Sequence, residues 1–364
     1  MVEVRYFGQS CFELYDGYYR LLFDPYLPKN HSQRTRSPEL HPNYILVSHG
    51  HEDHVGDAVA LSVDNDAPII TTPELGHFLE KEGFEVTLLD VHEDGVVRLE
   101  DLEAAVREDT ALVTIMFANN EIGTVQPIKE IGEFCRARKI PFHTDAVQAA
   151  GHMPINVQEM NIDLLSCSAH KFHGPRGVGF LYARRGIPLT NIIEGGAQER
   201  GKRGGTENVP GIAAMAAALK EACANMDENT KKVTALRDKL IDGISKIPHC
   251  ALNGARAPRL PGNVNFCFEG IEGESLLLLL DAKGISASSG SACTSGSLDP
   301  SHVLLAIGRP HEVAHGSLRL TICEDNTEEE IDYILAELPP IVDYLRNMSP
   351  VWKDLMSGKR QFTL

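Results

Sequence analysis

The chain has 364 residues, of which 43% are hydrophobic and 23% are charged, a composition typical of globular proteins. Its formal net charge of −17 at pH 7 argues against a nucleic-acid partner, because such proteins neutralise phosphates with basic side chains. No apolar run is long enough to span a bilayer, so no membrane partner is expected. The eight cysteines form no CxxC pair and no secretory signal begins the chain. These features predict reduced thiols in a cytoplasmic protein.

The first part of the chain, up to about Gly83, is predicted to form short strands. Glycine, proline and polar turns separate the apolar runs, which is the pattern of a β unit. The predicted strands are Val2–Phe7, Cys11–Leu14, Tyr19–Phe23, Tyr44–Ser48 and Pro68–Thr72. A helix over Glu74–Glu82 and a strand over Glu85–Leu89 are expected to follow.

A cluster of metal-binding residue types follows the fourth of these strands. His49, His51, Asp53 and His54 form an H-x-H-x-D-H pattern on one tight loop. Imidazole and carboxylate groups suit zinc, manganese or iron. The pattern therefore indicates a divalent-metal site, and a histidine-rich loop without a metal is the alternative.

Strands and helices alternate in the next part of the chain, which predicts a parallel sheet covered by helices. Strands are expected at Ala111–Met116, Pro141–Thr144, Leu164–Ser168 and Val178–Tyr182, and helices at Ile128–Arg138, Gly211–Cys223 and Asp227–Lys246. A smaller α+β unit is predicted to follow, with strands at Gly262–Phe268 and Leu318–Ile322 and helices at Gly273–Lys283 and Thr327–Arg346.

Three successive strands of the predicted sheet end in polar side chains. Asn120, Asp145 and Lys171 follow these strands, and ligands of open α/β sheets bind at the carboxyl ends of strands. A partly desolvated lysine can form a Schiff base, and a carboxylate can keep a pyridine nitrogen protonated. The alternatives are a lysine at the surface and an aspartate that caps the next helix.

From about Gly83 to Leu364 the chain resembles the NifS/IscS family of cysteine desulfurases, which have the class V aminotransferase fold. The motifs that carry the resemblance are FANNEIGTVQPIKEIG, HTDAVQAAGHMPINV, SAHKFHGPRGVGFLY, QERGKRGGTENVPGIAA, GISASSGSACTSGSLDPSHVLLAIG and HGSLRLTICEDNTEEEID. The resemblance implies pyridoxal 5'-phosphate as cofactor, held by Asn120, Asp145, Gln148, Ser168, His170, Lys171 and Thr206. Thr206 would reach across the interface of a homodimer.

The same resemblance implies the catalytic residues and the reaction. Lys171 and Cys293 would be catalytic, and Asn120 and Arg319 would bind the substrate, L-cysteine. Cys293 lies in a Gly/Ser-rich loop, SSGSACTSGS, of the kind that can carry a thiol into a site. Sulfur would pass to Cys293 as a persulfide, L-alanine would be released, and an acceptor or scaffold protein would take the sulfur for iron–sulfur or thio-cofactor assembly. Selenocysteine is a possible second substrate.

Residues 2–83 resemble a different family, the metallo-β-lactamase-fold hydrolases, in the motifs FGQSCFEL, LLFDPYL and ILVSHGHEDHVGDA. The later metal ligands of that family have no counterpart here, and the desulfurase motifs expected before Gly83 are absent. We therefore expect three parts: a β fragment at 1–83, an N-terminally truncated large domain of fold type I at 84–226, and an α+β small domain at 227–364. A metal-dependent hydrolase and an inactive fusion are the alternative functions.

Overall fold

The computed structural model describes residues 86–189, 193, 195–290 and 300–364, and it gives the backbone of five strands before them. The chain divides into two compact units, Met1–Leu88 and Leu89–Leu364. The expected domain boundaries after residues 83 and 226 stay predictions. No helix among the described residues is long and apolar enough to cross a membrane.

The first unit contains a single five-stranded sheet in the order β1-β2-β3-β4-β5. Its strands are Glu3–Gly8, Cys11–Tyr15, Arg20–Phe23, Tyr44–Val47 and Ile69–Thr71. β1, β2 and β3 pair antiparallel, whereas β3, β4 and β5 pair parallel. The five strands predicted for this part of the chain are therefore present, each within two residues of its expected ends.

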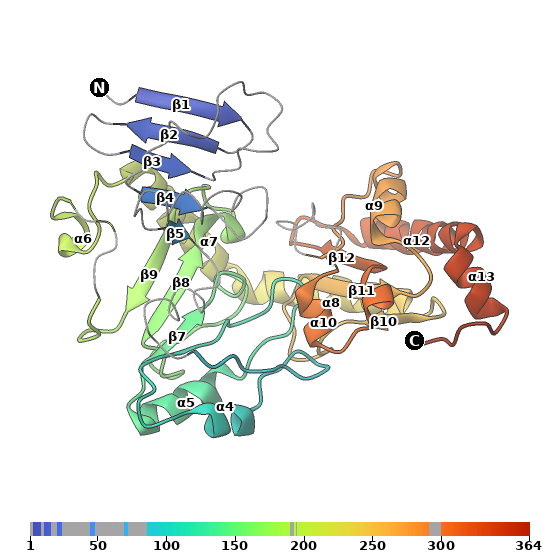
Figure 1. Cartoon of the computed structure of the whole chain (residues 1–364), viewed down its shortest axis with the longest axis horizontal. Helices are drawn as coiled ribbons and strands as arrows, with labels where there is room; N and C mark the ends of the chain where they lie inside the picture. The colour runs from blue at the N-terminus through green and yellow to red at the C-terminus, as the bar shows by residue number, and fades with distance from the viewer. Residues whose placement is uncertain are drawn as a thin grey trace. The chain divides into compact units, whose positions relative to one another are not determined.

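The second unit begins with a four-stranded sheet in the order β6-β7-β8-β9 (Figure 1). Its strands are Val113–Thr114, Phe142–Asp145, Leu164–Ser168 and Gly179–Ala183. β6, β7 and β8 are parallel, as predicted, but β9 runs antiparallel to β8. The ten residues between β8 and β9 are too few for a crossover helix, so the chain turns back beside the strand that it has just left.

Helix α5, Ile128–Arg138, covers this sheet and has the predicted bounds. Its buried residues are Ile128, Ile131, Gly132, Phe134 and Cys135, which recur at the three- and four-residue spacing of one helix face. The helix ends at Lys139, whose backbone is left-handed and whose N–H bonds back to the last turn. α5 thereby closes the core around Phe142 and Ile162.

The rest of the second unit forms a separate core around an antiparallel sheet, β10-β11-β12. The strands are Cys250–Leu252, Asn263–Phe268 and Ser317–Thr321. Three helices, α8 (Met226–Ile244), α9 (Gly273–Asp281) and α12 (Glu328–Met348), pack with them (Figure 1). A capping box of Thr327 and Glu330 starts α12. The shorter or peripheral helices are α4 (Leu99–Ala105), η2 (Ala169–Phe172), α6 (Gln198–Gly201), α7 (Val209–Ala224), α10 (His302–Ala306), α11 (His311–Ala314) and α13 (Pro350–Met356).

Two secondary-structure predictions differ from the structure. Residues 86–89 are not in a strand, and Leu88 is 84% exposed. These residues lie at the boundary between the two compact units in the sequence. They pair with no strand of the described sheets. The strand expected at Ala111–Met116 is reduced to the two residues of β6. α4 and β10 were not predicted because each is too short to show a clear hydrophobic period.

We predict that Gly132→Ala destabilises the protein although alanine favours helices. A Cβ built on Gly132 would lie 1.9 Å from the carbonyl oxygen of Met160, and such a clash with backbone costs roughly 1–3 kcal/mol. The measurement is the urea midpoint of unfolding. Glu133→Ala, an exposed change at the next position, is the control and should shift the free energy of unfolding by less than about 0.5 kcal/mol. Equal midpoints for the two variants would contradict the packing argument.

Candidate functional site

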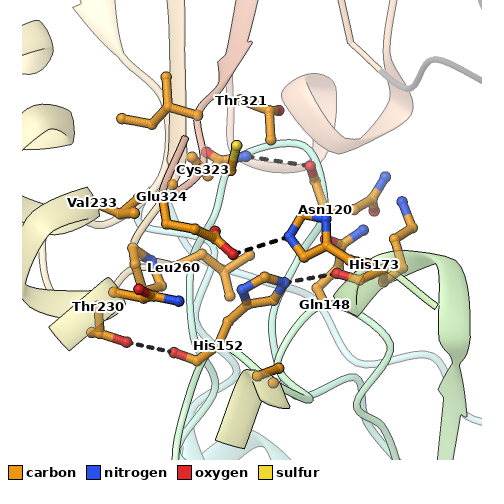
Figure 2. Close-up of a pocket in the computed structure, with 18 of the residues that line it drawn as sticks. Asn120, Gln148, His152, His173, Thr230, Val233, Leu260, Thr321, Cys323 and Glu324 are labelled. Carbon is orange, nitrogen blue, oxygen red and sulfur yellow. Dashed lines mark hydrogen bonds and ion pairs between the residues drawn. The ribbon is translucent and has the colours of Figure 1, made fainter. Parts of the chain in front are cut away.

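Four of the predicted site residues line one cavity of the second unit. Asn120, Gln148, Lys171 and Arg319 surround a space of about 140 Å³. They come from the segment after β6, the turn after β7, helix η2 and strand β12. Figure 2 shows Asn120 and Gln148 on one side of this cavity, with side chains from the small α+β core opposite. The structure thus brings together residues that lie up to 199 positions apart.

Lys171 is placed by a tight turn at the end of β8. Helix η2 starts directly after Ser168 and ends at His173, whose backbone is left-handed. His152 donates a hydrogen bond from Nε2 to the carbonyl oxygen of Lys171 over 2.8 Å. Thr230, on α8, donates in turn to the carbonyl oxygen of His152 over 3.1 Å (Figure 2). His152 therefore holds the carbonyl group of Lys171 and is itself held by Thr230 of α8, while Lys171 lines the cavity.

Arg319 reaches the cavity from β12. Its Nη1 donates to the carbonyl oxygen of Asn120 over 3.1 Å, and its backbone forms an isolated bridge with Ser288. A guanidinium group is suited to a carboxylate because it offers two parallel donors. Arg319 can therefore hold a small carboxylate close to Asn120 and Lys171.

An ion pair adds further charged groups to the cavity lining. His173 Nε2 lies 3.2 Å from Glu324 Oε1, and Lys232 donates to the carbonyl oxygen of Glu324. Cys323 also lines the cavity. No role was predicted from the sequence for His152, His173, Cys323 or Glu324. Their sequence positions could have indicated some of them. His152 follows Gln148 by four residues, and Cys323 and Glu324 follow the strand that carries Arg319.

The other predicted cofactor-binding residues lie outside this cavity. Ser168 and His170 line a second, more open hollow with residues 176–179, and the Ser168 hydroxyl is 2.7 Å from His170 Nδ1. Asp145 is exposed at the end of β7 and accepts the Val147 N–H over 2.8 Å, so it does cap the following turn. Thr206 is exposed and lines neither hollow.

A row of hydrogen bonds crosses the sheet behind Asp145. Thr114 Oγ1 lies 2.7 Å from His143 Nδ1, and His143 Nε2 lies 3.1 Å from Ser166 Oγ. Burial lowers the pKa of His143, and the nearby carboxylate of Asp145 offsets part of that shift. A neutral imidazole is therefore favoured in the folded protein.

Cys293 and the four predicted metal ligands, His49, His51, Asp53 and His54, lie outside the described residues. Within the described ranges, no group of three or more His, Cys, Asp or Glu residues is arranged to hold a metal ion. The six cysteines that fall in those ranges are free thiols. Burial raises the pKa of Cys135 to about 11 and that of Cys167 to about 12, which makes both poor nucleophiles at neutral pH.

Comparisons with known proteins agree with this arrangement. The sequence profile of the family described as aminotransferase class-V matches residues 52–334. The chain is 58% identical over 287 residues to the cysteine desulfurase IscS of Clostridium botulinum, covering 78% of this chain and 72% of the relative. It is 57% identical over 274 residues to the IscS of Methanosarcina thermophila, covering 75% of this chain and 68% of the relative.

The chain belongs to the cysteine desulfurase family of class-V aminotransferases. Solved structures agree: a NifS-like protein superposes with a TM-score of 0.69 at 36% identity, covering 83% of this chain and 75% of that one. A NifS-like protein from Rickettsia africae superposes at 0.65 with 28% identity, covering 83% of this chain and 76% of that one. The predicted family, the α/β class-V fold and the prediction of a desulfurase are confirmed at this level. The family profile starts at residue 52, inside the segment that we predicted to be foreign to this family.

Pyridoxal phosphate is the cofactor expected for this family, and the residues present fit it. Lys171 supplies an amine inside the cavity, with the Gln148 amide beside it. Asp145 supplies a carboxylate at the end of the neighbouring strand β7. Ser168 and His170 supply a hydroxyl and an imidazole at the end of β8, types of group that bind phosphate. The described residues therefore present a donor set suited to the cofactor's aldehyde, ring and phosphate.

We predict that His143 makes stability depend on pH. Because burial lowers its pKa below the ordinary 6.5, the unfolded chain takes up the proton more readily than the folded one. The contribution of neutral His143 is complete well above pH 6.5 and is lost as the pH falls through the lower folded-state pKa. Urea midpoints at pH 7.5 and 5.0 should therefore differ less for His143→Gln than for the natural chain. Identical pH dependence in both proteins would refute the assignment.

Proposed function

We propose that this chain is a cytoplasmic, homodimeric cysteine desulfurase that converts L-cysteine to L-alanine and passes the sulfur to Cys293 as a persulfide. The observation that supports this most directly is the convergence of Lys171, Asn120, Gln148 and Arg319 on one cavity. The names of the relatives, which are cysteine desulfurases, support the same substrate. A sulfur-acceptor protein for iron–sulfur or thio-cofactor assembly would complete the cycle.

Some of the cavity residues bind the substrate, and Lys171 transfers protons. Arg319 binds the α-carboxylate of cysteine, and the Asn120 side chain orients the substrate beside it. Lys171 binds the cofactor and, once freed by substrate, moves the proton at the α-carbon as a general base and acid. The bound cofactor supplies an electron sink for that carbon.

Burial and position decide which thiol accepts the sulfur. The raised pKa of Cys167 keeps its thiol protonated, and Cys267 is likewise buried with its pKa raised to about 11. The sequence around Cys293, SSGSACTSGS, is rich in Gly and Ser and has few large side chains. Cys293 is the acceptor that we propose, attacking the substrate sulfur as a thiolate while the alanine carbon keeps the electron pair of the broken C–S bond and is protonated.

Four finer parts of the assignment are separate hypotheses. Thr206 would complete the phosphate site only across a dimer interface, which its exposed position allows. The metallo-β-lactamase-like assignment of residues 1–83, the truncation of the large domain and a divalent metal at His49, His51, Asp53 and His54 rest on sequence motifs alone. Metal analysis of purified protein, before and after His51→Ala, tests the metal.

We predict that pyridoxal phosphate added to the purified protein gives an absorbance band near about 400 nm, the signature of the cofactor bonded to a lysine. Lys171→Ala should abolish both this band and alanine release from cysteine. Lys129→Ala removes an exposed lysine of α5 outside the cavity and should retain both. A band that persists in Lys171→Ala would place the cofactor elsewhere and refute the site.

We predict that Arg319→Lys raises the KM for L-cysteine by about tenfold or more. Lysine keeps the charge but loses the planar fork, and one lost charge-assisted hydrogen bond is worth about 1.5–3 kcal/mol. The absorbance band should be retained, because Arg319 is assigned to substrate. Steady-state alanine release against cysteine concentration is the measurement, and an unchanged KM would remove Arg319 from the substrate site.

A further inference from the structure

Glu121, the residue after Asn120, is a buried acid to which the family motifs gave no role. It is only 2% exposed, and an isolated buried carboxylate is costly. Its Oε2 accepts a hydrogen bond of 2.5 Å from the hydroxyl of Ser301. The two residues are 180 positions apart in the sequence. The tertiary fold therefore brings this carboxylate and this hydroxyl together.

The backbone around Glu121 is fixed from both sides. Asn119 Oδ1 accepts the N–H groups of Glu121 and Ile122 over 2.9 and 3.0 Å. The carbonyl oxygen of Glu121 accepts from the amides of Asn263 and Asn265, each over 3.0 Å. The carboxylate therefore has a set position relative to Asn120, which lines the cavity.

Ser301 and Gly290 flank residues 291–299, the sequence that contains Cys293. The Ser301 hydroxyl also accepts the N–H groups of Val303 and Leu304, so it caps α10. A Cβ built on Gly290 would lie 3.5 Å from Glu121 Oε2 and 3.6 Å from the Ser301 Cβ. Ser301 thus bonds to the Glu121 carboxylate, and Gly290 of the other flank lies close to the same pair.

Backbone and side-chain contacts link the surroundings of Glu121 and Ser301 to the substrate site. Ser288, two residues before Gly290, bridges the backbone of Arg319, and Ser317 donates to the carbonyl oxygen of Ser289. On the other flank, Leu304 packs in one buried cluster with Ile122, the neighbour of Glu121. The residues on both sides of 291–299 are therefore tied to the segment that carries Asn120 and to the strand that carries Arg319.

We propose that Glu121 is a positioning residue, which holds the C-terminal flank of the cysteine-bearing sequence through Ser301, close to Gly290 on the other flank, and so sets where the Cys293 thiol can meet the substrate sulfur. The inference rests on the proposed function. It assigns no chemistry to Glu121 itself.

The test compares Ser301→Ala, Glu121→Ala and Glu121→Gln as holoenzymes. Turnover to alanine should fall about tenfold or more in Ser301→Ala and Glu121→Ala, as expected when a reacting group is misplaced. The KM for cysteine should change by less than about twofold, because Arg319 is untouched. Glu121→Gln keeps an oxygen acceptor for Ser301 and should fall less. If Glu121→Ala fails to fold, Ser301→Ala and Glu121→Gln still decide the matter.

A second readout follows the Cys293 thiol directly. Alkylation by iodoacetamide, measured at the Cys293 peptide by mass spectrometry, should be about threefold or more faster in Ser301→Ala than in the natural chain, as for a segment with lowered local stability. The controls are Ser349→Ala, which removes the cap of α13 outside the cavity lining, and Glu269→Gln, which alters another buried acid. Neither should change the alkylation rate or turnover.

The outcomes separate the two proposals. Turnover and alkylation equal to those of the controls would overturn the anchoring role of Glu121, as would a raised KM at unchanged turnover. If the natural chain releases no alanine although its cofactor band is present, the desulfurase function fails. The alkylation rates would then still decide whether Glu121 and Ser301 position the thiol.

Discussion

Buried hydrogen bonds between strand β11 and the segment Asn119–Thr124 hold the two halves of the cavity together. Asn263 donates to the carbonyl oxygens of Asn120 and Glu121, and Asn265 donates to Glu121 as well. We call this set of hydrogen bonds between β11 and Asn119–Thr124 the joint. Arg259 stabilises the joint by donating to the carbonyl oxygen of Asn263. Burial, together with the nearby Arg237, lowers the pKa of Arg259. The buried guanidinium therefore needs hydrogen-bond acceptors such as the Asn263 carbonyl oxygen. Removing one acceptor would leave a buried donor unsatisfied.

The joint explains why two different sheets can share one site. The parallel strands β7 and β8 end at Asp145 and Ser168 and set the position of Lys171. β12 pairs with β11 in a fixed register, Asn265 opposite Arg319. Since Asn265 contacts Glu121 and Arg319 contacts Asn120, one pair of neighbouring residues on the small sheet meets one pair in the segment after β6. These hydrogen bonds fix the position of Arg319 relative to Asn120 in the cavity that Lys171 also lines.

Sequence reasoning reached the part of this site that depends on local rules. The carboxyl ends of successive strands indicated Asn120, Asp145 and Lys171, because side chains there share one edge of a sheet. Arg319 came from the family resemblance, since no local pattern shows that a strand 148 residues after Lys171 returns to it. The ion pair of His173 and Glu324 was missed for the same reason: its geometry exists only after the second core has packed. The two-residue β6 likewise depends on tertiary contacts, which override local propensity, whereas the antiparallel β9 follows from the short connection that precedes it.

The exposure of Asp145 has an electrostatic consequence for the cofactor. Two charges 4 Å apart interact by about 1 kcal/mol in water but by about 4 kcal/mol at the effective dielectric of a protein surface. A carboxylate at the end of β7 therefore controls a ring nitrogen strongly only when something excludes water from that edge. His143, two residues earlier on the same strand, is half-buried and bonds to Ser166, whereas Asp145 itself is exposed. Covering Asp145 with the cofactor ring would exclude water there and strengthen the interaction that makes the ring an electron sink.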